Sequence, residues 1–201
     1  MTRTRKSKSH KILLCTSFSD FAPESLNVVA SPMACLNEVT RKSFDLVAVS
    51  FHQITLRERD ALVELCSVLR KNPHSADTFL LCLVPSRHRA LLTSLQDAGV
   101  NYVMLLESPD GSLANRLHLF AENRSGAYSI EKILAEICPY INYVPISRRR
   151  EILYCQAYYN RLVLGPYLLN LYCETPNHIN CPYYMEPKFA KSSSSQKTKK
   201  P

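Results

Sequence analysis

The stretch Phe44-Asp45-Leu46-Val47-Ala48-Val49-Ser50 has a continuous apolar run, which is typical of a strand buried on both faces of a parallel sheet. We predict a strand over Asp45–Ser50. Runs of the same kind recur along the first 110 residues and predict four more strands, over Lys11–Thr16, Leu26–Ala30, Thr78–Pro85 and Tyr102–Leu106. Together they indicate a five-stranded sheet.

Helical patterns separate most of these runs, over Pro32–Lys42, Leu56–Lys71, Arg87–Asp97 and Gly111–Glu122. Pro32 suits a first helical turn, where a missing N–H costs nothing. Thr55 followed by Glu58 is the pattern of a capping box. Strands that alternate with helices of this length predict an α/β domain over residues 11–124, with a doubly wound, mainly parallel five-stranded sheet.

Three segments carry a resemblance to a known family: Lys11-Ile12-Leu13-Leu14, Phe44–Ser50, and Ala98-Gly99-Val100-Asn101-Tyr102-Val103. Their pattern resembles the two-component response-regulator receiver domain over residues 11–123. The resemblance implies a receiver-like fold and a role in signal transduction. Only residues 17–25 separate the first two predicted strands, so the family's first helix is expected to be shortened or missing. An unrelated doubly wound α/β domain is the alternative.

The resemblance does not extend to the family's chemical residues. Thr16 and Ser17 stand where a receiver has the acidic pair that holds magnesium, and Ser50 stands at its phosphoacceptor aspartate. Leu106 stands at its lysine, and only the hydroxyl of Ser86 has a counterpart. Hard cations require oxygen ligands such as carboxylates, and serine forms no acyl phosphate. We therefore expect a phosphorylation-dead pseudo-receiver that serves as an interaction platform for a protein partner.

Residues 129–187 have a different composition, with nine of the eleven tyrosines and the cysteines Cys138, Cys155, Cys173 and Cys181. Thiolates that converge usually hold a metal. A zinc site normally takes ligands from close C-x2-4-C pairs, which are missing in the C-x16-C-x17-C-x7-C spacing here. An iron–sulfur cluster tolerates dispersed ligands. The prediction is a module in which these four cysteines bind an iron–sulfur cluster or zinc; core thiols and a disulfide or thiol redox pair are the alternatives.

Local patterns suggest how this module is built. Ile130–Ile137 is expected to be a helix that delivers Cys138, after a joint at Ser125–Ser129. Glu151–Tyr159 has strand composition, Leu162–Leu164 follows a turn, and Gly165-Pro166 opens a short helix through Tyr172.

The net charge of +8 belongs to the two ends of the chain. Residues 1–11 and 188–201 each hold five Lys or Arg and no acid, which leaves 15 basic and 17 acidic residues between them. We expect residues 1–10 and 188–201 to be basic disordered tails. No apolar stretch suits a signal peptide or a membrane span, so the protein is expected to be cytoplasmic, without membrane association.

The pattern as a whole predicts a non-catalytic signalling or regulatory protein. The alternative is a nucleic-acid-binding regulator that uses the basic tails and Arg148–Arg150. A third reading is an oxidoreductase that uses the thiols or a cluster. No glycine-rich phosphate loop and no paired catalytic acids were found in the sequence.

Overall fold

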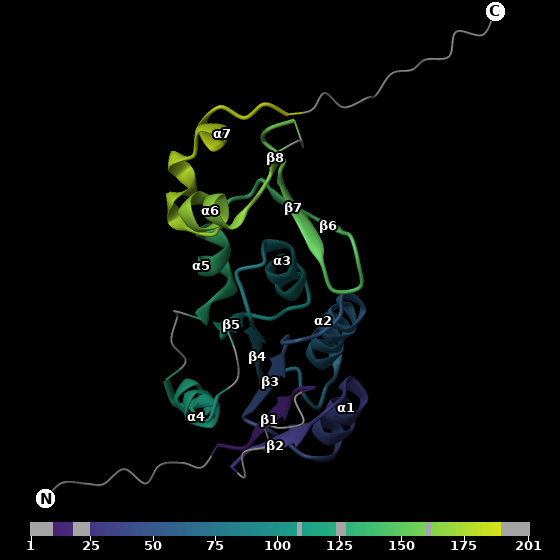
Figure 1. Cartoon of the computed structure of the whole chain (residues 1–201). Coiled ribbons are helices and arrows are strands. Elements are labelled where there is room, and N and C mark those ends of the chain that lie inside the picture. Colours follow the sequence, from purple (N-terminus) through teal and green to yellow (C-terminus); the bar gives the residue numbers. More distant parts are fainter. Residues whose placement is uncertain (1–9, 18–24, 108–109, 124–127, 160–161, 190–201) are drawn as a thin grey trace, which may run out of the picture. The chain divides into compact units, whose positions relative to one another are not determined.

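The computed structural model describes residues 10–17, 25–107, 110–123, 128–159 and 162–189 (Figure 1). The chain divides into two compact units, Met1–Leu134 and Ala135–Pro201, here called unit 1 and unit 2. Most of the predicted tails, the segment predicted to lack the first helix, and most of the predicted joint lie outside the described residues.

Unit 1 is built on five strands: β1 Ile12–Cys15, β2 Asn27–Val29, β3 Leu46–Ser50, β4 Phe79–Val84 and β5 Tyr102–Leu105. Every neighbouring pair is parallel, in the order β2-β1-β3-β4-β5. From β1, the sheet extends to β2 on one side and through β3 and β4 to β5 on the other side. The predicted α/β class with a five-stranded parallel sheet is confirmed, and this order is consistent with a doubly wound fold.

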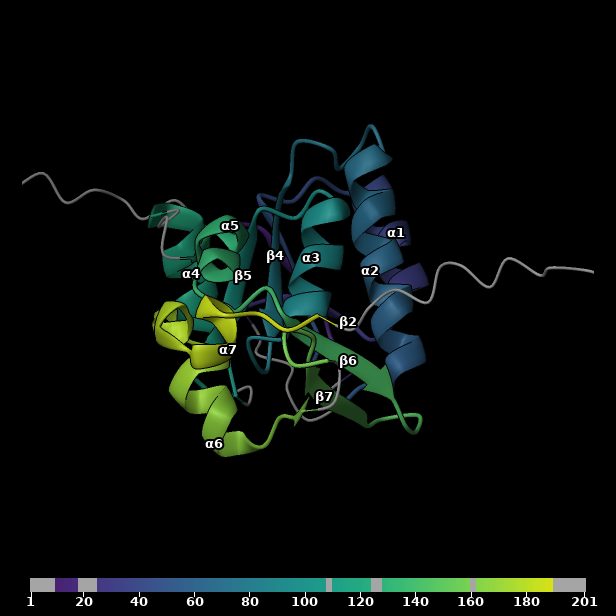
Figure 2. The ribbon, with the colours of Figure 1, turned by 90° about the horizontal axis from the view of Figure 1, so that it is seen from above.

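Five helices accompany this sheet: α1 Pro32–Arg41, α2 Leu56–Lys71, α3 Arg89–Asp97, α4 Leu113–Asn123 and α5 Ile130–Ala135. Figure 2 shows α1, α2 and α3 on one side of the sheet and α4 and α5 on the other. The predicted capping box is present, because Thr55 Oγ1 accepts from the Glu58 N–H at 3.2 Å and Glu58 Oε2 accepts from the Thr55 N–H at 2.7 Å. It fixes the start of α2 at Leu56.

Alternate residues of each strand face opposite sides of the sheet, so unit 1 has two buried layers. One layer joins the sheet to α4 and consists of Ile12, Leu14, Leu26, Leu46, Ala48, Leu81, Leu83, Met104, Leu106, Leu113, Ala114, Leu117 and Phe120. The α1, α2 and α3 side of the unit buries Cys35, Val39, Leu62, Leu65, Cys66, Leu69, Leu91, Leu92 and Leu95 from its helices. All strand residues from Leu46 to Ser50 are buried, as the continuous apolar run predicts.

Unit 2 has an antiparallel sheet of β6 Ile141–Pro145, β7 Glu151–Cys155 and β8 Leu162–Val163, in that order. Short helical turns follow: α6 Pro166–Leu168, a π-turn Leu169–Cys173, a 3-10 turn Pro176–Asn180 and α7 Pro182–Met185. The predicted strand over Glu151–Tyr159 is wrong beyond Cys155. There the chain turns, with the Gln156 N–H donating to the Tyr140 carbonyl at 2.8 Å and Tyr159 at a φ of 52°.

None of the helices in the described part of the chain has the length and apolar character needed to cross a membrane.

Candidate functional site

The four cysteines predicted as ligands line one small cavity of unit 2, with a volume of about 20 Å³. Cys138 precedes β6, Cys155 ends β7, Cys173 ends the π-turn and Cys181 precedes α7. Four segments far apart in the sequence therefore each contribute one cysteine to the wall of the same cavity.

Backbone hydrogen bonds hold these cysteines in position. The Cys138 N–H donates to the Cys173 carbonyl at 2.8 Å, which ties two of the four together. Cys155 pairs with Ile141 across the β6–β7 ladder. The Cys181 N–H donates to the His178 carbonyl at 3.0 Å, at the end of the 3-10 turn. Local structure thus fixes the main-chain positions of these cysteines.

Leucine and tyrosine side chains form the rest of the wall: Leu162, Leu164, Leu168, Tyr140, Tyr172, Tyr183 and Tyr184. The ring of Tyr184 lies 5.6 Å from that of Tyr140, between centroids, and 5.1 Å from the ring of His178. A wall of this kind limits the access of water, which is one means by which proteins tune a metal site.

His178 is a further candidate ligand that the sequence prediction did not include. It lines the cavity, is 6% exposed, and its Nδ1 lies 2.9 Å from the Thr175 carbonyl oxygen. Because a carbonyl only accepts, Nδ1 carries the proton of this hydrogen bond, which leaves Nε2 as the ring nitrogen that could ligate a metal. The only sequence signal for this residue was its position three residues before Cys181.

Burial favours the neutral form of two thiols of the cavity, Cys173 and Cys155. Burial, then the nearby Cys138, Cys181 and Cys155, raises the pKa of the Cys173 thiol to about 12. Burial also raises the pKa of Cys155. A metal that binds thiolates here must displace protons, which makes its affinity dependent on pH.

The spacing of these side chains limits what they can hold. Among the described residues, no three His, Cys, Asp or Glu side chains form a group that could hold a metal ion. A zinc site requires sulfurs at about 2.3 Å from one common centre. Cysteine thiolates suit a soft metal, so the chemistry of the donors agrees with the predicted ligands while their arrangement forms no metal site here.

Unit 1 has a second polar site at the carboxyl ends of β3 and β5. Ser50 Oγ lies 3.0 Å from His52 Nδ1, and His52 Nε2 makes a hydrogen bond to the Leu106 carbonyl. The Leu106 carbonyl only accepts, so Nε2 donates its proton to it and Nδ1 accepts a hydrogen bond from the Ser50 hydroxyl. Ser50 and His52 are each 3% exposed. The position that corresponds to a receiver's phosphoacceptor is thus a buried serine in a neutral network that links β3 to β5.

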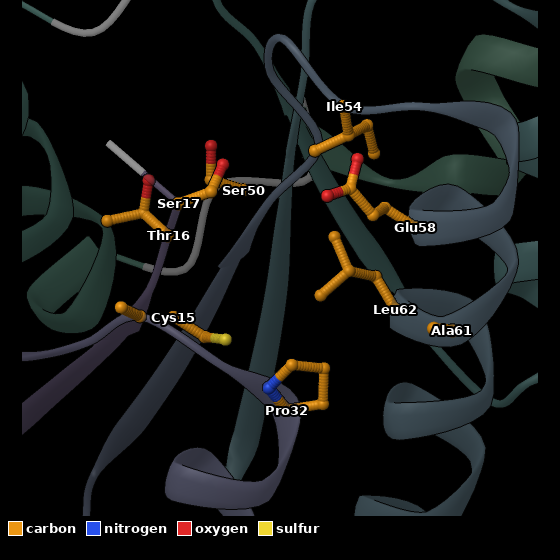
Figure 3. A pocket seen from close by; sticks show the side chains of 10 residues that line it. Cys15, Thr16, Ser17, Pro32, Ser50, Ile54, Glu58, Ala61 and Leu62 are labelled. Atoms are coloured by element: carbon orange, nitrogen blue, oxygen red, sulfur yellow. The ribbon is translucent and has the colours of Figure 1, made fainter. Parts of the chain in front are cut away.

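A cavity of about 170 Å³ opens beside Ser50 (Figure 3). It lies at the ends of β1 and β3, where the direction of sheet growth changes, the usual ligand position in open parallel sheets. Its wall consists of Cys15, Thr16, Ser17, Ala30, Pro32, Ser50, Ile54, Glu58, Ala61 and Leu62. Among the described residues that form this wall, Glu58 is the one acidic residue, so these residues do not supply the carboxylate cluster that a magnesium site requires.

The three arginines of the alternative prediction lie in the β6–β7 connection. Arg148, Arg149 and Arg150 are exposed, and Ser147 Oγ accepts from the N–H groups of Arg149 and Arg150 at 3.3 Å and 3.1 Å. None of them lines the cysteine cavity.

No protein-family model matches this chain, and no curated protein sequence matches it. The receiver resemblance therefore stays a prediction that rests on the residues quoted above. The function proposed below depends on the two cavities and the side chains around them.

Proposed function

We propose that this protein is a non-catalytic regulatory protein with two parts. Unit 1 is a receiver-like, phosphorylation-dead platform that binds a protein partner. Unit 2 binds an iron–sulfur cluster, or zinc, through Cys138, Cys155, Cys173 and Cys181. The observation that supports the proposal is the presence of all four cysteines in the wall of one cavity, together with leucine and tyrosine side chains.

The composition of the unit 2 core supports a metal over plain structural thiols. Its buried apolar residues are Ile137, Cys138, Ile141, Cys155, Ala157, Leu164 and Cys173. Three of these are cysteines, and the aliphatic remainder is small. A unit of about 55 residues buries too little apolar surface to be comfortably stable alone, and small domains of this size often rely on a metal or disulfides.

The residues at the carboxyl ends of the unit 1 strands support a role as an interaction platform that takes no part in phosphotransfer. Thr16, Ser17 and Ser50 bring hydroxyls but no carboxylate to the place where a receiver binds magnesium and phosphate. The hydroxyl of Ser50 is engaged by His52. Signalling by this unit would therefore depend on surface recognition and not on phosphorylation.

The test is metal analysis of the full chain, produced and purified without oxygen. A cluster gives iron and acid-labile sulfide in similar amounts with visible absorbance, whereas zinc alone would support the metal site and contradict the cluster. Less than about 0.2 metal per chain with no absorbance would refute the metal site, because a site that contributes folding energy is normally filled.

Alanine variants sharpen this test. Cys138→Ala, Cys155→Ala, Cys173→Ala and Cys181→Ala should each lower the metal content, and Cys66→Ala is the matched control. Cys66 is a fully buried cysteine of unit 1, so its loss should leave the metal content unchanged. Equal metal content in all five variants would locate the metal elsewhere.

The exposed Arg148–Arg150 segment favours one second candidate, a nucleic-acid-binding regulator. Phosphate binding by such a segment predicts that affinity for a nucleic acid falls steeply as salt rises. Replacing all three arginines with serine should reduce both the affinity and its dependence on salt. Unchanged binding in that variant would refute this candidate.

A further inference from the structure

Unit 1 contains two pairs of cysteines that each join a helix to the sheet. Cys66 on α2 and Cys82 on β4 have their sulfurs 3.7 Å apart. Cys35 on α1 and Cys15 at the end of β1 form a side-chain hydrogen bond. All four thiols are buried, and each pair joins a helix to a strand of the sheet.

The two pairs differ in what lies next to them. Cys15 lines the cavity of about 170 Å³, and Figure 3 shows its sulfur directed into that cavity, between Pro32 and Leu62. Cys35, Cys66 and Cys82 do not line it. Cys15 as a whole is 2% exposed. Hydrogen peroxide is little larger than water, so a cavity of this volume admits it.

The hydrogen bond within each pair also polarises the thiols. The bond from Cys35 lowers the pKa of the Cys15 thiol, against the opposing effect of burial. The same bond, followed by burial, raises the pKa of Cys35. In the other pair, burial raises the pKa of Cys82 well above its usual value. Cys15 is thus the thiol of unit 1 that combines thiolate character with a route for a small oxidant, the two properties of peroxide-sensitive cysteines.

We propose that Cys15 is a site of oxidation by hydrogen peroxide, and that Cys35 converts the oxidised Cys15 into a disulfide. In the first step the Cys15 thiolate, its proton released to water in the cavity, attacks one peroxide oxygen. An S–O bond forms and the O–O bond breaks. The sulfur is oxidised to a sulfenic acid, and the peroxide is reduced to hydroxide, which takes up a proton as water.

In the second step Cys35 attacks the sulfur of Cys15. The S–S bond forms, the S–O bond breaks, and the departing hydroxide takes the proton of the Cys35 thiol and leaves as water. The hydrogen bond to Cys15, the main cause of the raised pKa of Cys35, ends with the first step. The sum is two thiols and one peroxide converted to one disulfide and two waters. The disulfide would tie α1 to β1 beside the cavity.

The first experiment uses the reduced full-length chain without any substitution. It is exposed to hydrogen peroxide for increasing times, the remaining thiols are alkylated, and each cysteine is followed by peptide mass spectrometry. Cys15 and Cys35 should lose reactivity together and appear as a linked peptide, about tenfold faster than any change at Cys66 and Cys82. Equal rates for the two pairs, or no Cys15–Cys35 link, would overturn the proposal.

Variants separate the two steps. In Cys35→Ala, the sulfenic acid at Cys15 should persist and be captured by dimedone, while Cys15→Ala should leave Cys35 reduced. Cys82→Ala is the matched control and should leave the Cys15–Cys35 link unchanged. Absence of a dimedone adduct at Cys15 in folded Cys35→Ala protein would overturn the proposed first step.

A third variant tests the route through the cavity. Ala61 is an exposed α2 residue in the cavity wall, so Ala61→Phe should narrow the cavity and slow Cys15 oxidation several-fold. Val68→Phe, on the same helix and outside that wall, is the control. Equal oxidation rates in the two variants would show that the cavity is not the route. Because none of these readouts depends on metal in unit 2, the proposal stands or falls separately from the proposed function.

Discussion

Unit 1 and unit 2 use cysteine in opposite ways. In unit 1, the buried cysteines are a small part of a core between helices and sheet that is filled by residues such as Leu81 and Leu117, both 0% exposed. In unit 2, cysteines make up a large part of the few buried apolar residues and share one cavity. The difference teaches that unit 1 has the core of an ordinary α/β domain, whereas unit 2 has few aliphatic residues to stabilise it and, in our proposal, relies on a metal bound by its thiols.

Removal of the metal is expected to have the largest effect, which is the unfolding of unit 2. Treatment of the metal-loaded chain with a strong chelator should expose residues 135–189 to hydrogen exchange while residues 12–107 stay protected. A structural zinc contributes about 10–16 kcal/mol to the folding of a small finger, so its loss is enough to unfold a unit of this size. Equal protection of both units before and after chelation would contradict the comparison.

Truncation of core leucines should affect the two units unequally. Leu117→Ala removes a fully buried side chain between α4 and the sheet and should lower the free energy of unfolding of unit 1 by about 2–5 kcal/mol. Leu164→Ala, at the wall of the cysteine cavity, should cost less in the metal-loaded protein, about 2 kcal/mol at most. Denaturant titration followed by hydrogen exchange separates the units. A larger loss for Leu164→Ala would show that aliphatic packing governs unit 2 as well.

The polar network of unit 1 should contribute a smaller amount. His52→Ala leaves the Ser50 hydroxyl without its acceptor and the Leu106 carbonyl without its donor, and should cost about 1–3 kcal/mol. The exposed His74 supplies the control, because His74→Ala should change stability by less than about 0.5 kcal/mol. Thermal melts of the two variants are the measurement. An unchanged melting temperature in His52→Ala would mean that the network adds no stability.

Alkaline pH should lower the stability of unit 2, and only in metal-free protein. The pKa of Cys173 rises from 9.0 to about 12 on folding, so folded and unfolded chains both keep the proton below pH 9. Between pH 9 and 12 the unfolded chain releases it first, and stability therefore falls as pH rises. Melting of metal-free and metal-loaded protein across this range is the measurement. A metal-loaded protein that weakens in parallel would show that Cys173 is not bound as a thiolate.

The sequence predicted unit 1 well because its signals are local and repeated. Strand β3 and helix α2 agree with the predicted segments within one residue at each end, since buried apolar runs and the capping box mark their own limits. The prediction missed β6 entirely. Its residues Ile141–Pro145 contain asparagine, tyrosine and a proline, and the strand exists through pairing with β7, a contact distant in sequence.

The candidate sites show the same division between local and distant signals. The four cysteines that cluster in the sequence line one cavity, whereas no sequence pattern placed His178 in its wall; their role as metal ligands stays a prediction. The Ser50–His52–Leu106 network and the cavity at Cys15 depend on the meeting of separate strands. The spacing of residues along the chain does not predict which strands meet in this way.

The hydrogen bond between the Cys138 N–H and the Cys173 carbonyl has a further consequence for the length of chain that this unit tolerates. It closes a long loop of the chain, and doubling the length of such a loop costs only about 0.6 kcal/mol. Residues inserted into the hairpin at Arg148–Arg150 should therefore leave the backbone positions of the cysteines at either end of the loop unchanged.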